Sequence, residues 1–497
     1  MKKTRLVSAA LAVAMAAAAF SGCGAKKDTA WEDPKALPKD GYEINWYFYG
    51  EPQSDTTAVE QKINEYLKDK INATVKLNRL TSSQYSQKMN AMIAAGEYYD
   101  ICFTANWMLS YATTAANGAW LPLDDYLDDY MPKTKEIIGD DILNNTRVNG
   151  KIYGIPAMKE MATAKGIAYR KDIAEKYNID MTKVKNLDDL KEILKFVQSK
   201  EPDMQYPIDW PSNDRKPTTL ERFEPIAASV GFECIDPENN VYSEKIIHSA
   251  FSENMEKAYY KAREFYTDGL IKKDVLTAKD FDQRLKSGKV FAYIEHLKPG
   301  KVEEVSRDFS FKLGSVQLTN PVMDRNAGTG SMMSVSAKSK NPARAMKFLE
   351  LMNSDKYLNN LVVFGIEGKH YNKLDDNTVK VIPNSGYTLS ESQWMMGNVF
   401  LNYLTEGENP DKIQLLKEFN KEATKPCFYG FVFDSTPVQQ QIAAVKTVEE
   451  QYAALVSCGA TDVEPTLTEF REKLKKAGVQ DIIDEVQKQY DAFKAKK

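Results

Sequence analysis

Three glutamates of the chain could form a reactive or ligand-binding site. Glu51, Glu160 and Glu295 each lie just past a segment that we predict to be a β-strand, and α/β proteins bind ligands at the carboxyl ends of their strands. Two such carboxylates could act as the acid and nucleophile of a glycosidase, whose acids need share no sequence motif. Each glutamate alone is more simply interpreted as a solvated loop acid. As a group they favour a site.

Three tryptophans are the second group of residues that could form a binding site. Trp107, Trp210 and Trp394 lie in polar or turn-like sequence, whereas a core tryptophan more often lies within an apolar run. Flat aromatic faces next to polar groups suit sugar rings, which stack through their C–H faces and hydrogen bond through their hydroxyls. Each tryptophan taken singly could instead be structural. The group predicts a sugar-binding surface.

Common catalytic signatures are missing from the sequence. It contains no GxSxG, GxxxxGK[ST], GxGxxG or HExxH motif. The three histidines, His248, His296 and His370, are far apart and lack metal-ligand spacing. The sequence therefore predicts no metal and no organic cofactor.

The first hundred residues alternate between strand and helix patterns. Residues 43–49 are apolar on both faces, as in a buried parallel strand. Ser54 or Asp55 can cap a helix whose apolar stripe is Val59, Ile63, Leu67 and Ile71. A strand at 73–80, a helix at 84–95 and a strand at 100–104 follow. This order predicts an α/β domain with a largely parallel sheet.

The rest of the chain repeats the alternation less regularly. We predict a helix at 109–117, a hairpin at Asn149-Gly150, a strand leading into a helix over 166–172, helices at 187–199, 259–271 and 341–354, strands at 287–296 and 311–318, and helices in the last forty residues.

An export signal precedes these elements. Basic residues 1–5 are followed by an apolar run, 6–20, that is too short to span a bilayer. Small residues then stop directly at Cys23, as in a bacterial lipoprotein signal, although ordinary signal cleavage with an incidental Cys23 is the alternative. Residues 24–40 are polar and contain prolines, which is typical of a tether. The sequence predicts a signal peptide at 1–22 and a lipid-anchored tether at 23–40.

Length and charge limit the function classes further. A chain of 497 residues can form two domains with large cores. Its formal charge of -4 becomes -7 when the signal's Lys2, Lys3 and Arg5 are removed, which argues against nucleic acid as a partner. The four cysteines after Cys23 are widely spaced and indicate neither a zinc site nor a disulfide scaffold.

The mature chain resembles the extracellular solute-binding proteins, family 1, of ABC importers, in particular the large carbohydrate-associated lipoproteins. The resemblance is carried in order by EYYDICFTANW, GAWLPLDDYL, VNGKIYGIPA, GIAYRKD, AYYKAREFYTDGLIKKD, LKSGKVFAYIEH and NPARAMKFLELMNS. GFVFDSTPVQQQIAAVKTV and FREKLKKAGVQDIIDEVQKQYDAF resemble the C-terminal region of one subgroup.

The resemblance implies an α/β, two-lobed periplasmic-binding-protein-like fold of type II, with a ligand cleft between lobes that crossing hinge strands join. By this similarity the N-terminal lobe holds residues 41–158 plus 318–380, and the C-terminal lobe holds 159–317 plus 381–497. IPAMKEM and GSVQLTNP would be the two crossings. Ligand would bind both lobes and shift an open–closed equilibrium without making or breaking a bond.

The same resemblance implies the site and the partners. Ligand contacts would come from Tyr49, Glu51, Asn106 and Trp107 of the first lobe, from Glu160 in the first crossing, and from Trp210, Glu295, His296 and Trp394 of the second lobe. The expected protein is a monomer, lipid-anchored at the extracellular face of the bacterial cytoplasmic membrane, that delivers an oligosaccharide to the transmembrane permease subunits. Two alternatives stay open: a secreted glycoside hydrolase, and the same fold binding a peptide or another polar solute.

Overall fold

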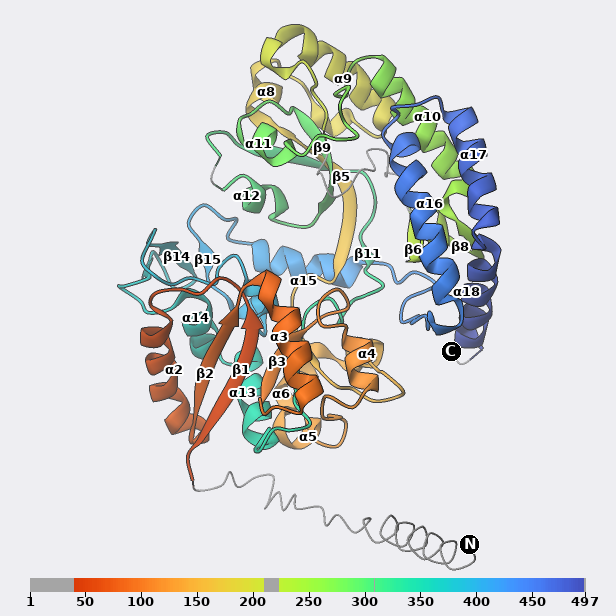
Figure 1. The fold of residues 1–497 in the computed structure, drawn as a ribbon. Coiled ribbons are helices and arrows are strands. Elements are labelled where there is room, and N and C mark those ends of the chain that lie inside the picture. The colour runs from red at the N-terminus through yellow and green to blue at the C-terminus, as the bar shows by residue number, and fades with distance from the viewer. Residues whose placement is uncertain (1–39, 210–222, 308, 496–497) are drawn as a thin grey trace, which may run out of the picture.

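The computed structural model describes residues 40–209, 223–307 and 309–495. The predicted signal peptide, the tether with Cys23, and Trp210 lie outside these residues. The described chain forms two α/β bodies, one above the other, with a group of C-terminal helices beside them (Figure 1).

The first body is built on a five-stranded sheet with the order β2-β1-β3-β12-β4. Strands β2 and β3 run parallel to β1, and β12 runs antiparallel to β3 and β4. The bounds are β1 Tyr42–Tyr49, β2 Ala73–Leu80, β3 Ile101–Thr104, β4 Ile155–Pro156 and β12 Met332–Val335. The predicted, largely parallel sheet is confirmed, with β12 arriving from a distant part of the chain.

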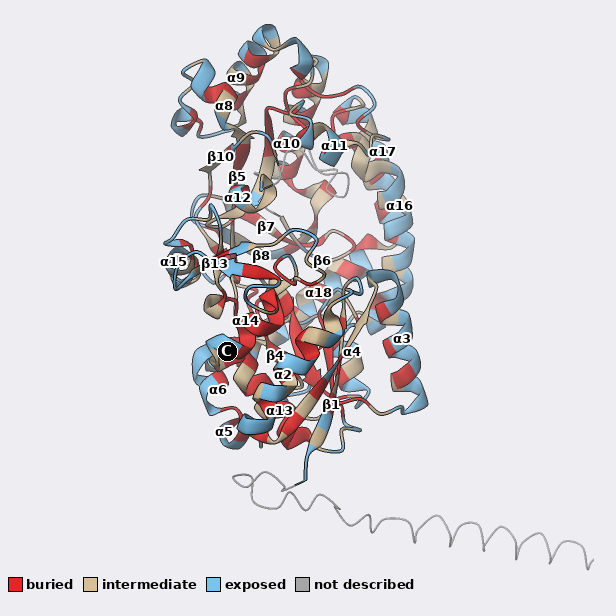
Figure 2. Ribbon diagram, turned by 90° about the vertical axis from the view of Figure 1, so that its left-hand side faces the viewer, coloured by how far each residue is buried: buried red, intermediate tan, exposed pale blue. Residues whose placement is uncertain are grey.

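Amphipathic helices cover this sheet. In α2 (Thr56–Ile71) the predicted stripe Val59, Ile63, Leu67 and Ile71 is buried, and burial of such a stripe holds a helix against a sheet. The other helices here are α3 Ser82–Ala95, α4 Tyr111–Ala116, α5 Leu127–Tyr130, α6 Pro132–Ile138, α7 Asp140–Asn145, α13 Pro342–Ser354 and α14 Lys356–Phe364. Figure 2 shows the buried residues gathered on the strands and on the inward sides of these helices.

The start of helix α2 and the turn at Asn149-Gly150 can each be compared with the prediction. Asp55 precedes α2, but its side chain makes no cap hydrogen bond to the helix and instead contacts Lys369 Nζ at 2.6 Å and His370 Nε2 at 3.1 Å. The predicted hairpin at Asn149-Gly150 is confirmed: both residues have positive φ, and Val148 pairs with Lys151, as a type I′ turn requires.

The second body has the sheet order β10-β5-β9, and all partners run antiparallel to β5. The short β11 pairs with the first residues of β5. The strands are β5 Ala162–Arg170, β9 Ala292–Leu297, β10 Leu313–Gln317 and β11 Val322–Met323; the helices are α8 Lys171–Lys176, α9 Leu187–Lys200, α10 Glu253–Thr267, α11 Phe281–Lys286 and α12 Lys301–Val305. Helix α10 begins six residues before the predicted start because the Ser252 hydroxyl accepts from the Met255 N–H at its N-terminus.

The C-terminal helices form a third core with an antiparallel sheet of order β6-β7-β8. Phe232 of β7 lies 4.7 Å from Phe428 and 4.8 Å from Tyr490 between ring centroids. The elements are β6 Phe223–Ala227, β7 Val230–Asp236, β8 Val241–His248, α16 Gln439–Ser457, α17 Val463–Lys476 and α18 Val479–Lys494. Residues 223–251 contain the sheet β6–β8, and residues 427–495 contain the three helices. Together we name these two segments the C-terminal unit.

Residues 381–424 pack differently from the predicted domain division. Tyr387, Leu389 and Met396 are buried in the same core as the five-stranded sheet. Strand β15 (Leu404–Thr405) pairs with β14 (Thr378–Val381), which pairs with β13 (Tyr371–Lys373), and Phe419 of α15 (Lys412–Glu422) joins that core as well. This packing corrects the predicted boundary, and we propose that 381–424 belong to the first lobe.

Candidate functional site

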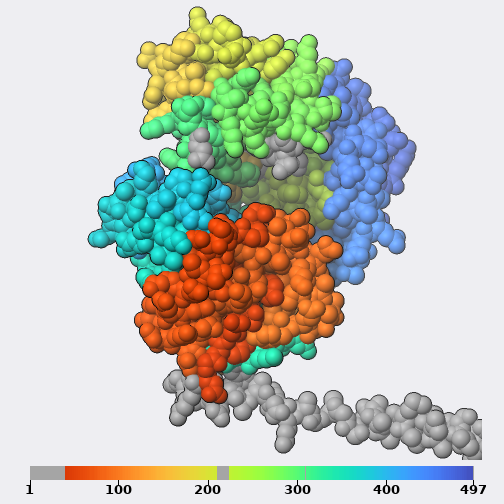
Figure 3. All heavy atoms as spheres, turned by 60° about the vertical axis from the view of Figure 1, so that its left-hand side comes forward, coloured from red at the N-terminus to blue at the C-terminus, as the bar shows by residue number. Residues whose placement is uncertain are grey.

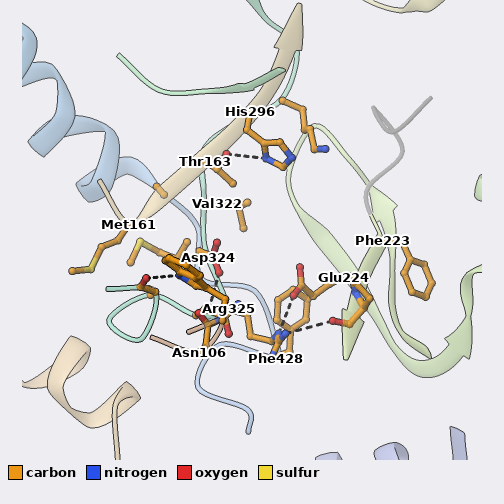
Figure 4. A pocket seen from close by; sticks show the side chains of 18 of the residues that line it. Asn106, Met161, Thr163, Phe223, Glu224, His296, Val322, Asp324, Arg325 and Phe428 are labelled. Carbon is orange, nitrogen blue, oxygen red and sulfur yellow. Dashed lines mark hydrogen bonds and ion pairs between the residues drawn. The ribbon is translucent and has the colours of Figure 1, made fainter. Parts of the chain in front are cut away.

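A cleft of about 800 Å³ lies between the two α/β bodies. Figure 3 shows the molecule hollowed between the red-orange first body and the green second body, with the blue C-terminal helices closing one side. The close view of Figure 4 places residues of the first body, of the connecting segments and of strand β6 around one space. This volume is in the upper part of the usual range for ligand sites, about 300–1,000 Å³.

Three chain segments run side by side between the bodies. Ala162 and Thr163 of β5 pair with Met323 and Val322 of β11, and Val322 also pairs with Thr424. The first two segments directly follow the predicted crossings, residues 155–161 and 314–321, whereas the third was not predicted. Its only sequence signal is its short, proline-marked character before Pro426.

Asn420 of α15 ties the first crossing to the helix. Its Oδ1 accepts from the backbone N–H groups of Met161 at 2.8 Å and Ala162 at 3.2 Å, and its Nδ2 donates to the Lys159 carbonyl at 2.9 Å. Such a set fixes the path of the chain where it leaves the first body, because each of these backbone groups needs a partner.

Trp107 presents an aromatic face to the cleft. The side chain is 54% exposed, and its Nε1 donates to the Gly330 carbonyl at 2.9 Å. The rings of Tyr49, Phe103 and Trp394 each lie 6.0 Å from it between centroids. The tryptophan is therefore exposed on one side and supported on the other, as a stacking surface must be.

The loop that carries Trp107 holds a strained backbone. Leu109 has φ of 50°, which is costly for a side chain branched beyond Cβ and recurs at functional sites. The loop is closed by a hydrogen bond from the Ala105 N–H to the Met108 carbonyl at 2.9 Å. The Thr104 hydroxyl adds a bond to the Leu109 carbonyl at 3.1 Å. Asn106, next to Trp107, also lines the cleft.

Tyr49 and Trp394 stand behind this surface. Burial raises the pKa of Tyr49 to about 12, so its hydroxyl is neutral at physiological pH. Trp394 packs against the core of the first body, so its predicted place in the second lobe is corrected. Neither side chain belongs to the described lining of the cleft. Their role here is to hold Trp107.

Glu160 lies in the first crossing and lines the cleft. Its Oε1 is 3.2 Å from Lys298 Nζ and 3.6 Å from Lys159 Nζ. Burial alone would raise the pKa of this carboxyl, but the two lysines outweigh it and hold the pKa below its ordinary value. Glu160 is thus a carboxylate at neutral pH, able to accept hydrogen bonds from a ligand.

The Glu160 contact continues into a chain of ion pairs. Lys298 Nζ also lies 3.1 Å from Glu304, whose other oxygen is 2.8 Å from Lys412 of α15. Lys298 and Lys412 likewise hold the pKa of Glu304 below its ordinary value, against the opposing effect of burial. A glycosidase acid needs a raised pKa, so neither carboxyl is suited to that role.

Glu295 and His296 are neighbours on β9 with different positions. His296 lines the cleft, and its Nδ1 is 3.4 Å from the Thr163 hydroxyl. Glu295 accepts from the His296 backbone N–H at 2.8 Å and lies 3.8 Å from Lys301 Nζ. In this arrangement Glu295 and the exposed Glu51 stand outside the described lining.

Arg325 and Glu224 are site residues that sequence reasoning missed. Arg325 follows β11, and its Nε donates to Glu224 Oε1 of β6 at 2.9 Å (Figure 4). The ion pair joins the first body to the C-terminal unit across the cleft. Nothing in the local sequence indicates it, because the partners are a hundred residues apart.

Two properties of the described residues bear on other functions. Within residues 40–209, 223–307 and 309–495, no group of three or more His, Cys, Asp or Glu side chains could hold a metal ion. In the same ranges, no helix combines the length and the apolar character needed to cross a bilayer.

Comparison with protein families gives two matches. Residues 61–364, more than half of the chain, match the family model of the bacterial extracellular solute-binding proteins. Residues 427–495 match a domain of unknown function. The second match coincides with the helical part of the C-terminal unit.

Among curated proteins, a carbohydrate ABC transporter substrate-binding protein of Streptococcus pneumoniae is 26% identical over 456 residues, which is 90% of each chain. Lipoprotein LipO of Bacillus subtilis is 23% identical, over 71% of this chain and 73% of its own.

Among solved structures, the N-glycan transport solute binding protein of Streptococcus pneumoniae is 26% identical, with a TM-score of 0.81 over 92% of this chain and all of the other. Its complexes with Man1GlcNAc and Man5GlcNAc score 0.71 and 0.66.

These matches confirm the predicted family and the predicted α/β solute-binding fold. They also rule out the alternative of a secreted glycoside hydrolase, because the family is not catalytic. The chain belongs to the bacterial extracellular solute-binding proteins.

Proposed function

We propose that this protein captures an oligosaccharide in the cleft between its lobes and delivers it to the permease of an ABC importer. The observation that carries the proposal is the exposed face of Trp107, supported from behind, in a cleft of about 800 Å³ that also presents hydrogen-bonding groups. A flat apolar face beside polar groups is what a pyranose ring requires.

The ligand is a neutral, branched oligosaccharide of the N-glycan type. The similarity to the N-glycan transport protein, which has been solved with Man1GlcNAc and Man5GlcNAc, supports this sugar class. The charges of the cleft support it as well. Lys298 is paired with Glu160 and Glu304, and Arg325 with Glu224, so these cations are already neutralised by carboxylates of the protein.

The geometry of the cleft supports the following contacts. Trp107 stacks on one sugar ring, while Asn106, Glu160 and His296 bond to hydroxyl groups. Tyr49 and Trp394 support Trp107. Trp210, outside the described residues, stays a predicted contact, as do Glu51 and Glu295, which would have to reach the ligand in another arrangement of the lobes.

Binding shifts the two lobes towards a closed arrangement. The first of the three N-glycan transport protein structures has a TM-score of 0.81 with this chain, and the two sugar complexes score lower, at 0.71 and 0.66. This order supports an open arrangement for the structure described here. The three crossing segments are where the lobes would turn.

The site of action is the outer face of the bacterial cytoplasmic membrane. The protein is a monomer held there by a lipid on Cys23, and its closed form docks on the transmembrane permease subunits. The N-terminal sequence and the similarity to a lipoprotein support the anchor.

Calorimetric titration of the protein without residues 1–22 tests the proposal. Man1GlcNAc, Man5GlcNAc, a linear plant oligosaccharide and a peptide mixture are titrated in turn, and the sugars are then analysed for cleavage. Micromolar or tighter binding of Man5GlcNAc, recovered intact, is expected. Binding of peptides alone would refute the carbohydrate function, and binding of only the plant sugar would refute the N-glycan class.

A further inference from the structure

A second cavity of about 410 Å³ adjoins the cleft on the far side of Arg325. One wall belongs to the first lobe and includes Ala112 of α4 and Arg147. The opposite wall belongs to the C-terminal unit and includes Phe433 and Lys446. Nothing in the proposed function accounts for this space.

The two cavities share their boundary. Asn106, Arg325 and Asn326 line both of them. The Arg325 guanidinium reaches across to β6, bonding to Glu224 Oε1 at 2.9 Å and lying 3.5 Å from the Pro225 carbonyl. Figure 4 shows Arg325 between Asn106 on one side and Glu224 on the other. The ion pair of Arg325 with Glu224 is therefore part of the boundary between the two spaces.

The tip of the β6–β7 hairpin lies at the same boundary. Its two turn residues, Ala228 and Ser229, have φ of 45° and 52°, a conformation that Asn-Gly would adopt far more easily. Ala228 lines the second cavity and Ser229 lines the first. Strained turns of this kind recur where a binding site requires a specific backbone path.

The chemistry of the second cavity suits a sugar. Asn145 lines the cavity and is fixed by hydrogen bonds from its Nδ2 to the carbonyls of Arg325 at 3.4 Å and Ala327 at 2.6 Å. Arg147 is paired with Asp124, as Arg325 is with Glu224. The charge of each arginine is therefore balanced by a carboxylate of the protein, which suits a neutral ligand. Partly buried Phe433 adds an aromatic ring.

We propose that this second cavity is an additional sugar subsite, which takes one arm of a branched neutral oligosaccharide whose other part lies on Trp107. The inference rests on the proposed function and assigns a role to the C-terminal region: it supplies one wall of the subsite and so selects for ligand size. A disaccharide fits within the main cleft, whereas a branched hexasaccharide extends past Arg325 into the second cavity.

Ala112→Trp tests the inference by filling the second cavity. Ala112 is exposed on α4 and lines only this cavity. Ala116→Trp is the matched control, because Ala116 is exposed on the same helix and lines neither space. Lys446→Trp blocks the cavity from the opposite wall. Thermal unfolding of all three variants checks that they are folded.

The measurement is the affinity of each variant for Man1GlcNAc and for Man5GlcNAc by calorimetry. We expect Ala112→Trp and Lys446→Trp to weaken Man5GlcNAc binding by about tenfold or more while leaving Man1GlcNAc binding within about twofold, and Ala116→Trp to change neither. Wild-type affinity for Man5GlcNAc in both blocked variants would overturn the second subsite and leave the proposed function standing. Equal loss for both sugars would also overturn it, because the cavity would then not discriminate by size. Absence of binding to the wild-type protein would overturn the proposed ligand class and the subsite together.

Discussion

Replacing Trp107 by alanine should weaken oligosaccharide binding without unfolding the protein. The face that is lost is the exposed one, since 54% of the side chain is open to solvent. Loss of an aromatic anchor of this kind costs about 1–3 kcal/mol of binding free energy, which corresponds to roughly a 5- to 150-fold rise in Kd.

The effect of Trp107→Ala on stability can be bounded in the same way. The buried part of the ring is a little under half of a side chain that can bury up to about 250 Å², so the loss of apolar burial is at most about 3 kcal/mol. The hydrogen bond from Nε1 to Gly330 at 2.9 Å is lost as well, at about 0.5–1.5 kcal/mol. The core around the five-stranded sheet is large and extends far from Trp107, and we expect a lowered but cooperative unfolding transition.

The assay is calorimetry with Man5GlcNAc, combined with thermal unfolding of each variant. Phe196→Ala is the matched control, because Phe196 is a 40% exposed aromatic on α9 that does not line the cleft. Its affinity should equal that of the wild-type protein. If folded Trp107→Ala binds the sugar as tightly as the control does, the ring is structural and the stacking assignment is refuted.

Three further changes test the crossing, the carboxylate and the anchor. Asn420→Ala removes three hydrogen bonds from the first crossing and should lower stability by about 1–3 kcal/mol and change the radius of gyration in X-ray scattering, whereas Gln414→Ala on the exposed side of α15 should do neither. Glu160 has a lowered pKa in the folded protein, so its ionised form contributes stability above the ordinary carboxyl pKa, and this contribution disappears as pH falls through the lower folded value. The difference in Tm between wild type and Glu160→Gln should therefore be constant from pH 8 to about 5 and shrink below about pH 4.5; a constant difference down to pH 3 would contradict the ion pair with Lys298. Cys23→Ser should release the mature protein from membranes into the medium, and its retention in the membrane fraction would argue against the lipid anchor.

Sequence periodicity predicted those elements that are stabilised locally. The stripe of α2 and the Asn149-Gly150 turn are determined by spacing and by backbone preference, and both are where the sequence indicates. Helix α10 begins six residues before its predicted start, because the cap at Ser252 extends it beyond the apolar residues from 259 onwards. Helix ends depend on single hydrogen bonds, which periodicity does not register.

The residues of the candidate site differ in the same way: some are determined locally along the chain, and others depend on long-range packing. Trp107 and Glu160 could be singled out because each lies just past a predicted strand, and ligand sites of α/β proteins lie at the ends of their strands. Arg325 and Glu224 could not, since their contact depends on how the C-terminal unit packs against the first lobe. The assignment of Trp394 to the wrong lobe has the same cause: residues 381–424 stay packed on the first core instead of crossing to the second body, and no composition change marks where the chain leaves that core.

The C-terminal helices are part of the binding protein rather than an appended domain. Their core is shared with β6–β8, more than 170 residues earlier in the chain, through contacts such as Phe232 with Phe428 and Tyr490. Neither the three-stranded sheet nor the helices could bury these rings alone, because each apolar face needs the other as its cover. The sheet in turn carries Glu224 and the strained turn at the edge of the cleft. Sequence changes within the helices therefore reach the ligand through this shared core, and they can alter one wall of the site while the two α/β lobes and their crossings stay as they are.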